Sequence, residues 1–367
     1  MRQTVAHFSD STTFGGTEQV IITLLASLDR SRWQPVLISS GGQAASSLIN
    51  AARDLDVLVH QVPPMPEGSR GAIRVAAFAR TLRYVRPDIF HAHLTWALSC
   101  KYGLAGALLA RVPAVVATQH LLIDAPLTGW QAAQHRLILS RVGCITAVSR
   151  HIARHLVDDL HLPPAKVAVV HNGIPLQPSA RGIDVPRRAG CPTVLVPARL
   201  DPQKGHRTVL EAARLLPHVT FLLAGDGPMR QDLEGKATQM GIADRVHFLG
   251  FQADMAALYA QCDIVCLGSL FEGFPLSVLE AMAAARPVVA GRIPGIDEIV
   301  VDGETGLLVQ PGDPTALAAA LERLFRDPVH AAALGTRGRK RVEREFSAEA
   351  MAQGISLIYD RLLEKRA

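Results

Sequence analysis

Two acidic residues, Glu272 and Glu280, flank a short segment where an apolar strand is predicted to become a helix. The strand is expected at residues 263–267, and Pro275 with the strong helix formers after it predicts a helix to about residue 285. The first N–H groups of a helix lack partners within it and carry partial positive charge, which suits a diphosphate. The two carboxylates can accept hydrogen bonds from hydroxyl groups. The segment therefore has the chemistry to bind a nucleotide sugar, although a solvated loop acid and a first-turn helix acid would give the same pattern.

Two cations, Arg199 and Lys204, follow a strand predicted at residues 193–197 and precede a helix expected from about His206. A strand-end arginine and a loop lysine beside a helix start can clamp a diphosphate and stabilise leaving-group charge in place of a metal. Two ordinary surface cations are the alternative. The segment lacks the glycines of G-x-x-x-x-G-K-[ST], and no G-x-G-x-x-G follows a strand, so the ATPase and dinucleotide-binding fingerprints are absent from the sequence.

Polar residues also follow the predicted strands of the first half of the chain. Gly15 and Gly16 precede a helix expected at residues 19–28, so their backbone can approach a phosphate or a sugar closely. His91 and His93 end a strand and point to the same face of it. A metal pair is conceivable there, but no third ligand stands at an obvious spacing, so we predict no metal site. The other polar residues at strand ends are His120, Ser149 and Asn172.

Apolar strands alternate with amphipathic helical stretches along the chain, which predicts an α/β fold with parallel sheets covered by helices on both faces. The segment 173–191 is rich in Gly and Pro without sustained periodicity and is predicted to be a linker. We therefore expect one domain at residues 1–172, a second at 192–346, and a helix in residues 347–367 that can return to the first. The predicted strands are at residues 4–8, 35–38, 56–62, 88–91, 114–118, 144–148, 166–170, 193–197, 220–224, 245–249, 263–267, 287–290 and 306–309.

Composition favours a cytoplasmic globular protein. Of 367 residues, 49% are hydrophobic and 19% charged, enough for two domains with ordinary cores. The first ten residues predict a strand rather than a signal peptide, and the longest nearly apolar stretch falls short of the roughly 18 residues of a membrane span. The five cysteines have no zinc-type spacing and are expected to be buried thiols.

The net charge of +5 is modest, but one segment is more basic than the rest. It contains Arg136, Arg141, Arg150 and Arg154 together with three histidines. The outer face of helices that pack inward would explain this pattern. The alternative is a docking face for an anionic membrane or a lipid-phosphate acceptor.

Several segments match a known family in the order in which they occur. They are Leu223-Ala224-Gly225-Asp226-Gly227-Pro228, Phe271-Glu272-Gly273-Phe274-Pro275-Leu276 and Asp302-Gly303-Glu304-Thr305-Gly306-Leu307-Leu308. With these and the residues described above, the chain resembles the GT4-type retaining glycosyltransferases of GT-B fold over nearly its whole length. One departure is Gly295-Ile296-Asp297-Glu298, where the family more usually has Pro just before Glu. The resemblance implies two Rossmann-like, doubly wound parallel-sheet domains facing across a cleft.

The resemblance implies that the second domain binds the donor. Glu280 would hold the ribose, Arg199 and Lys204 the diphosphate, and Glu272 the sugar hydroxyls. The helix-start segment that adds to these contacts is Gly273, Phe274, Pro275, Leu276 and Ser277.

The resemblance implies that the first domain receives the acceptor. His93, with His91 as second choice, would lie near the anomeric carbon, and His93, Glu272, Arg199 and Lys204 form the predicted catalytic set. Gly15 and Gly16 would touch the diphosphate when the domains close. The residues expected on the acceptor side are His91, His120, Ser149 and Asn172.

The expected reaction is transfer of a sugar from an NDP-sugar, of the UDP or GDP type, with retention of configuration and without a metal or another cofactor. The acceptor would be a glycan, a lipid-linked intermediate or a small molecule, and no nucleic acid partner is expected. The setting would be polysaccharide or glycoconjugate biosynthesis in the cytoplasm, with peripheral contact to the membrane as an option. The alternatives are a sugar-nucleotide epimerase, a phosphorylase and a non-catalytic sugar-nucleotide-binding protein.

Overall fold

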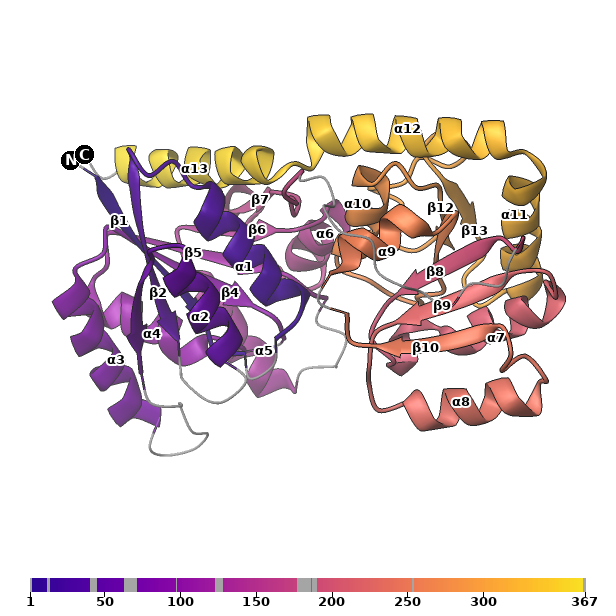
Figure 1. Ribbon diagram of the computed structural model, residues 1–367. Coiled ribbons are helices and arrows are strands. Elements are labelled where there is room, and N and C mark those ends of the chain that lie inside the picture. Colours follow the sequence, from indigo (N-terminus) through magenta and orange to yellow (C-terminus); the bar gives the residue numbers. More distant parts are fainter. Residues whose placement is uncertain are drawn as a thin grey trace. The chain divides into compact units, whose positions relative to one another are not determined.

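The structure is a computed structural model that describes residues 2–11, 14–39, 45–62, 71–96, 98–122, 128–176, 186, 190–252 and 254–365. The chain divides into two compact units, each with one parallel sheet and its own helices (Figure 1). Unit 1 contains Met1–Pro175 and Ala348–Ala367, and unit 2 contains Leu176–Ser347. Most of the segment predicted as a linker, at 177–185 and 187–189, lies outside the described residues.

Seven strands form the sheet of unit 1, in the spatial order β3-β2-β1-β4-β5-β6-β7. All neighbouring strands are parallel, and β4 and β5 are buried along their whole length, as the apolar runs predict. The strands are β1 (Gln3–Ser9), β2 (Trp33–Ser39), β3 (Leu58–Gln61), β4 (Ile89–Leu94), β5 (Ala114–Gln119), β6 (Cys144–Ala147) and β7 (Val167–Val169).

The helices of unit 1 form two groups. In one group α1 packs against α2 and α13, and in the other α4 packs against α3 and α5. The helices are α1 (Gly16–Ser27), α2 (Ser46–Asp54), α3 (Gly71–Val85), α4 (Lys101–Ala110), α5 (Gly129–Leu139), α6 (Arg150–Asp158) and the C-terminal α13 (Ala348–Glu364). Because α13 belongs to unit 1, the chain leaves this unit after Pro175 and returns to it at Ala348.

Unit 2 repeats the same plan with six parallel strands in the order β10-β9-β8-β11-β12-β13. Helix α7 packs against α8 and α11, whereas α10 packs against α9 and α12. The strands are β8 (Thr193–Pro197), β9 (Thr220–Ala224), β10 (Val246–Gly250), β11 (Ile264–Leu267), β12 (Val288–Gly291) and β13 (Leu307–Val309). The helices are α7 (His206–Leu215), α8 (Arg230–Gln239), α9 (Met255–Gln261), α10 (Leu276–Ala283), α11 (Pro314–Arg326) and α12 (Pro328–Glu345).

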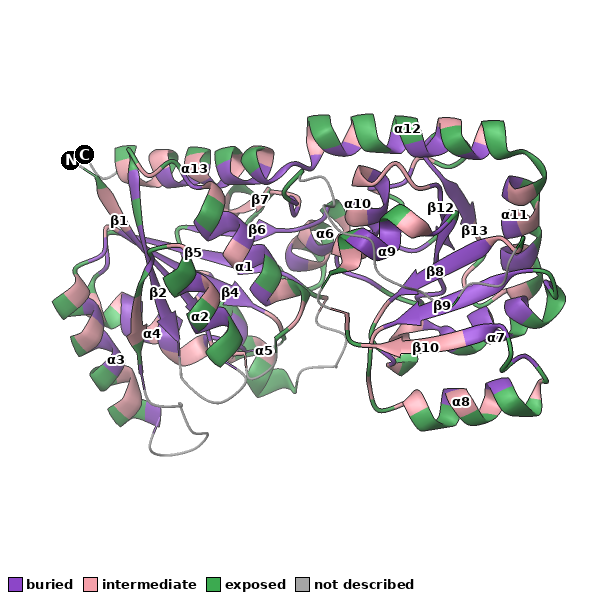
Figure 2. Ribbon diagram, in the orientation of Figure 1, coloured by how far each residue is buried: buried purple, intermediate pink, exposed green. Residues whose placement is uncertain are grey.

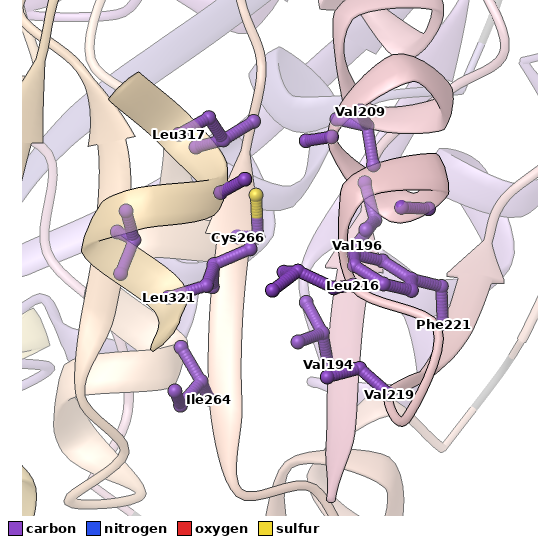
Figure 3. Close-up of a cluster of buried hydrophobic side chains, with 14 of the residues drawn as sticks. Val194, Val196, Val209, Leu216, Val219, Phe221, Ile264, Cys266, Leu317 and Leu321 are labelled. Carbon is purple, nitrogen blue, oxygen red and sulfur yellow. The ribbon is translucent and has the colours of Figure 1, made fainter. Parts of the chain in front are cut away.

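The core of unit 2 fixes the strands that carry the site. Val194 and Val196 on β8, with Ile264 and Cys266 on β11, pack under apolar side chains of α7 and α11 (Figure 3). Most strands of both units are buried, with β3, β7 and β10 more exposed than the rest, while the helices turn exposed faces outward (Figure 2). Burial of apolar surface contributes about 25 cal/mol per Å², so this packing holds the carboxyl ends of β8 and β11 in place.

The predicted α/β class and the parallel sheets are confirmed, and each of the predicted strands is present, with bounds shifted by a few residues. Two details are wrong. Helix α1 begins at Gly16 rather than at Gln19, because the Glu18 side chain accepts a hydrogen bond from the Gly15 amide and completes the first turn. Strand β4 continues past His91 to Leu94, so His93 lies within the strand. The prediction that the domains face one another across a cleft stays a prediction.

Candidate active site

The candidate site lies in unit 2, where the order of the sheet reverses between β8 and β11. Strand β8 connects outward to β9 in one direction, and β11 connects to β12 in the other. Ligands of doubly wound sheets bind outside the carboxyl ends of the strands at such a switch point. Two loops leave this edge side by side, because the amide of Leu270 after β11 donates to the carbonyl of Gln203 after β8 at 2.8 Å.

A backbone contact between Gly205 and Gly268 sets the spacing of these two loops. Gly205 has a φ of +62°, and a Cβ atom there would lie 1.9 Å from the carbonyl oxygen of Gly268. Both the left-handed backbone and the close approach therefore require glycine at this position.

Replacement of Gly205 by alanine tests this contact. We expect a loss of about 2–4 kcal/mol in the free energy of unfolding, from left-handed strain and from displacement of the Gly268 loop. The matched control is Gly241→Ala, which has a φ of +67° but no atom within 4 Å of the added Cβ. Urea denaturation of both variants measures the two effects, and equal losses would show that the loop contact is unimportant.

Lys204 and Glu272 form a partly buried ion pair between the two loops. The Lys204 Nζ lies 2.7 Å from Glu272 Oε1, and the side chains are 17% and 6% exposed. The same carboxylate oxygen accepts a hydrogen bond of 2.7 Å from the hydroxyl of Ser269. The structure thus brings together two of the predicted catalytic residues. They place a cation and a carboxylate at one point of the sheet edge.

Glu280 lies one turn into α10 and has a different partner. Its Oε2 accepts a hydrogen bond of 2.9 Å from the hydroxyl of Tyr259 on α9. Burial raises the pKa of Glu280, and the hydrogen bond from Tyr259 opposes this shift. Burial also raises the pKa of Tyr259 well above its usual value, so the phenol keeps its proton and acts as a donor.

The start of α10 presents backbone amides beside Glu272. Pro275 occupies the N-cap position and no side chain caps the helix, so its first N–H groups remain available to an anion. The ring of Phe274 packs on Phe346 at a centroid distance of 5.5 Å. At Gly295, with a φ of +86°, a Cβ atom would lie 2.5 Å from the carbonyl oxygen of Gly273, so this loop abuts the segment closely. Phe274 therefore anchors the segment, whereas Leu276 and Ser277 begin the helix.

Arg199 lies apart from the Lys204–Glu272 pair. Its side chain is 63% exposed and forms an ion pair of 2.6 Å with Asp201. The sequence placed Arg199 and Lys204 in one phosphate clamp, but the described contacts join only Lys204 to Glu272. The clamp by both cations therefore stays a prediction.

Sequence reasoning missed Ser269 and Tyr259. Ser269 precedes Glu272 in the loop, and serine is too common in loops for its type alone to signal a role. Tyr259 reaches Glu280 through the packing of α9 on α10, which no local spacing reveals.

Unit 1 contains a row of buried imidazoles on adjacent strands. Nδ1 of His7 on β1 lies 3.2 Å from Nε2 of His93 on β4, and Nδ1 of His93 lies 3.1 Å from Nε2 of His120 after β5. The side chain of His93 is buried, at 1% exposure. A buried ring does not by itself explain how His93 would act near the anomeric carbon. That role stays a prediction.

Burial keeps these imidazoles neutral. It lowers the pKa of His7 and of His120 to about 3, and the pKa of His91 and His93 well below the usual value. For His91 and His93 the neighbouring imidazoles lower the pKa further, because each ring would become a cation beside the others, and for His7 the charge of Arg30 does so.

His91 has partners on both ring nitrogens. Nδ1 lies 2.6 Å from the hydroxyl of Tyr359 on α13, and Nε2 lies 2.6 Å from the hydroxyl of Thr118. His91 therefore joins α13 to the sheet. Its acceptor-side role stays a prediction.

His7 is a third imidazole that could bind a metal beside His91 and His93, and the sequence did not reveal it. One ring nitrogen from each of His7, His91 and His93 lies within 4.8 Å of the others, the donor set of a three-histidine zinc site. The sequence could not show this, because only the pairing of β1 with β4 brings His7 to His91. The group contains no carboxylate, so a divalent ion would be buried without a neutralising charge. The prediction of no metal site stays a prediction.

The remaining predicted residues of unit 1 have structural positions. The hydroxyl of Ser149 accepts from the amide of Ile152 and caps α6. Asn172 is buried. Gly15 and Gly16 have no close neighbour that a Cβ would strike, the nearest atom being 3.7 Å away. Unit 1 itself therefore does not require glycine at these two positions.

Two family descriptions match the two halves of the chain. Residues 14–178 match the description "Glycosyltransferase Family 4", and residues 184–341 match "Glycosyl transferases group 1". Among curated relatives, the lipopolysaccharide core biosynthesis glycosyltransferase LpsE of Rhizobium meliloti is 36% identical over 169 residues, 46% of this chain and 49% of that protein. The match thus spans about half the length of this relative. The 2-deoxystreptamine glucosyltransferase of Streptomyces kanamyceticus is 29% identical over 76% of this chain and 78% of its own.

Solved structures share the fold at lower identity. Anabaena HepE in complex with UDP and glucose is 23% identical, with a TM-score of 0.83 over 96% of this chain and 98% of that chain. A Rickettsia africae glycosyltransferase is 21% identical, with a TM-score of 0.86 over 99% of both chains. Similarity at this level establishes the fold of the whole chain.

Proposed function

The chain belongs to the family 4 glycosyltransferases and has their GT-B fold, and on this basis we propose that it transfers a sugar from an NDP-sugar to an acceptor with retention of configuration. The observation that carries the proposal is the partly buried Lys204–Glu272 ion pair at the switch point, beside the start of α10. A cation and free helix amides suit a diphosphate, and a carboxylate suits sugar hydroxyls.

The chemistry follows from where charge develops. As the glycosidic bond to the phosphate breaks, negative charge grows on the departing diphosphate and positive charge on the anomeric carbon. Lys204, Arg199 and the amides of α10 stabilise the phosphate, so the proposed reaction needs no metal ion. The acceptor hydroxyl attacks from the face that the phosphate leaves, and the phosphate takes its proton.

The proposed donor is a UDP- or GDP-sugar. The structurally similar HepE binds UDP and glucose, which supports a nucleotide sugar of this type. In this proposal Glu280, whose Oε2 accepts a hydrogen bond from Tyr259, accepts from the ribose hydroxyls. The names of LpsE and of the 2-deoxystreptamine glucosyltransferase support a glycan, lipid-linked or small-molecule acceptor, and that of LpsE supports a setting in polysaccharide biosynthesis.

We also propose cytoplasmic action with peripheral contact to an anionic membrane through α5. No helix within the described parts of the chain is long and apolar enough to cross a bilayer. Helix α5 carries Trp130 and Leu137, which are 75% and 56% exposed, beside the exposed Arg136. Exposed apolar and basic side chains together suit an anionic lipid surface. His135 does not contribute, because burial lowers its pKa to about 4.

Liposome flotation tests the membrane contact. We expect the protein to float with anionic vesicles and to remain behind with neutral ones, and Trp130→Ala to reduce the floating fraction. Tyr84→Ala is the control, because Tyr84 is 81% exposed on α3, outside the proposed surface. Equal recovery with both vesicle types would contradict the proposal.

A panel of UDP-, GDP- and ADP-sugars, each incubated with and without candidate acceptors, tests the main proposal. Consumption of one donor only with an acceptor, giving an α-linked product from an α-linked donor, is the expected result. Isomerisation of the donor without an acceptor would instead indicate an epimerase, and binding without turnover a non-catalytic protein.

Glu272→Ala tests the role of the loop carboxylate. We expect kcat/KM to fall by roughly 10- to 150-fold, because a hydrogen bond to a charged group contributes about 1.5–3 kcal/mol. Glu211→Ala, at an exposed position on α7, is the control and should leave the kinetics unchanged. Unaltered kinetics in a folded Glu272→Ala enzyme would refute the role.

A further inference from the structure

Two hydroxyl groups hold the two carboxylates of the candidate donor site, each by one oxygen. Ser269 donates to Oε1 of Glu272 at 2.7 Å, and Tyr259 donates to Oε2 of Glu280 at 2.9 Å. In the part of the chain that the structure describes, Glu272 Oε2 and Glu280 Oε1 have no hydrogen-bond partner. Each carboxylate therefore has one oxygen fixed by the protein and one left for a ligand.

Ser269 is rigidly placed. It is fully buried in the loop between β11 and α10. A Cβ atom on Gly291 of β12 would lie 3.1 Å from the Ser269 carbonyl oxygen, so the neighbouring strand closely abuts this loop. With Lys204 it gives Glu272 Oε1 two donors at 2.7 Å, which fix the rotation of the carboxylate plane.

Tyr259 is placed by the packing of α9 on α10. It is 2% exposed, and its hydroxyl lies 2.9 Å from Glu280 Oε2 and 3.3 Å from the carbonyl oxygen of Ser277. A protonated phenol has one hydrogen, so these two acceptors compete for it and the charged one attracts it more strongly. Tyr259 thereby holds the Glu280 side chain against the first turn of its own helix.

We propose that Ser269 and Tyr259 are positioning residues with separate effects, Ser269 orienting Glu272 for the sugar in the transition state and Tyr259 orienting Glu280 for the nucleoside in the ground state. The inference rests on the proposed function. The inference goes beyond that function because it assigns Glu280 to binding and Glu272 to the transition state, each through its buried hydroxyl partner. An interaction present in both ground and transition states changes affinity, whereas one that tightens only in the transition state changes kcat.

Ser269→Ala and Tyr259→Phe remove only the hydroxyl groups and test this division. For Ser269→Ala we expect kcat to fall about tenfold, with the calorimetric Kd for the free nucleoside diphosphate unchanged. For Tyr259→Phe we expect the Kd for the free nucleoside diphosphate and the KM for the NDP-sugar each to rise about tenfold, with kcat nearly unchanged. Tyr84→Phe, at an exposed position, is the control and should alter neither quantity.

The thermal unfolding temperature of each variant separates positioning from general stability. The inference is overturned if both variants change the same kinetic parameter, or if both lower the unfolding temperature and leave Kd and kcat at the wild-type values. A wild-type protein that neither binds a nucleoside diphosphate nor consumes an NDP-sugar would refute the proposed function itself. The two failures are therefore distinguishable, because the second is seen before any variant is made.

Discussion

Lys204→Ala is expected to lower kcat/KM by about 10²- to 10³-fold, the cost of removing one preorganised donor from developing charge. The ammonium group lies 2.7 Å from Glu272, so its loss removes a cation from the departing phosphate and also leaves a buried carboxylate without its ion-pair partner. Both effects slow the step in which the bond between the sugar and the diphosphate breaks. Steady-state kinetics with the preferred donor measures the loss.

Controls separate these effects from a loss of folding. Lys340→Ala removes an exposed lysine from α12 of the same unit and should leave kcat/KM unchanged. Because breaking a buried ion pair is destabilising, thermal unfolding must show that Lys204→Ala is folded at the assay temperature. The double variant Lys204→Ala/Glu272→Ala should lose less than the product of the two single losses, because the residues act as a pair. A folded Lys204→Ala enzyme within threefold of the wild type would contradict the assignment.

The two buried imidazoles of His7 and His120 are expected to cost unit 1 about 4 kcal/mol of stability between pH 8 and pH 5. The pKa of His7 and that of His120 are about 3 in the folded protein, against an ordinary value of 6.5. The unfolded chain therefore binds protons below pH 6.5, while the folded chain does not until about pH 3. The stabilisation is fully present above pH 6.5 and is lost as the pH falls toward 3. At pH 5 the loss is about 2 kcal/mol for each of these two imidazoles, and His91 and His93 act in the same direction.

Tryptophan fluorescence isolates unit 1 in this experiment. The three tryptophans of the sequence, Trp33, Trp96 and Trp130, lie within the span of unit 1. Urea titrations at pH 8 and pH 5 give the two free energies of unfolding. In His7→Gln the difference between them should shrink by about 2 kcal/mol, whereas in His161→Asn, which removes an exposed imidazole, it should not change. Equal stability of the wild type at both pH values would contradict the neutral, buried state of the cluster.

The sequence predicted the strands well because buried parallel strands are short apolar runs between polar loops. It also indicated the two loops of the candidate site, since Glu272, Glu280 and Lys204 lie where strands end and helices begin. Strand ends in a doubly wound sheet meet at one edge, so residues distant in sequence, such as Lys204 and Glu272, could be expected to approach each other.

What the sequence could not provide depends on packing between elements. Tyr259 reaches Glu280 from another helix, and His7 reaches His93 from a neighbouring strand. The burial of His93 was missed because the sequence placed this residue at the polar end of the strand, whereas β4 continues to Leu94 and is buried along its whole length. In each case strand pairing or helix packing determines the partner, and neither kind of contact produces a recognisable pattern of residue spacing in the sequence.

The central claim is that unit 2 holds a nucleoside diphosphate through protein cations and the start of α10. Calorimetric titration of the wild-type protein with UDP and with GDP, in buffer containing excess EDTA, tests it most directly. We predict saturable binding of one nucleotide per chain, with a Kd that is the same with and without EDTA. Absence of binding by both nucleotides, or binding that appears only when a divalent ion is restored, would contradict the account.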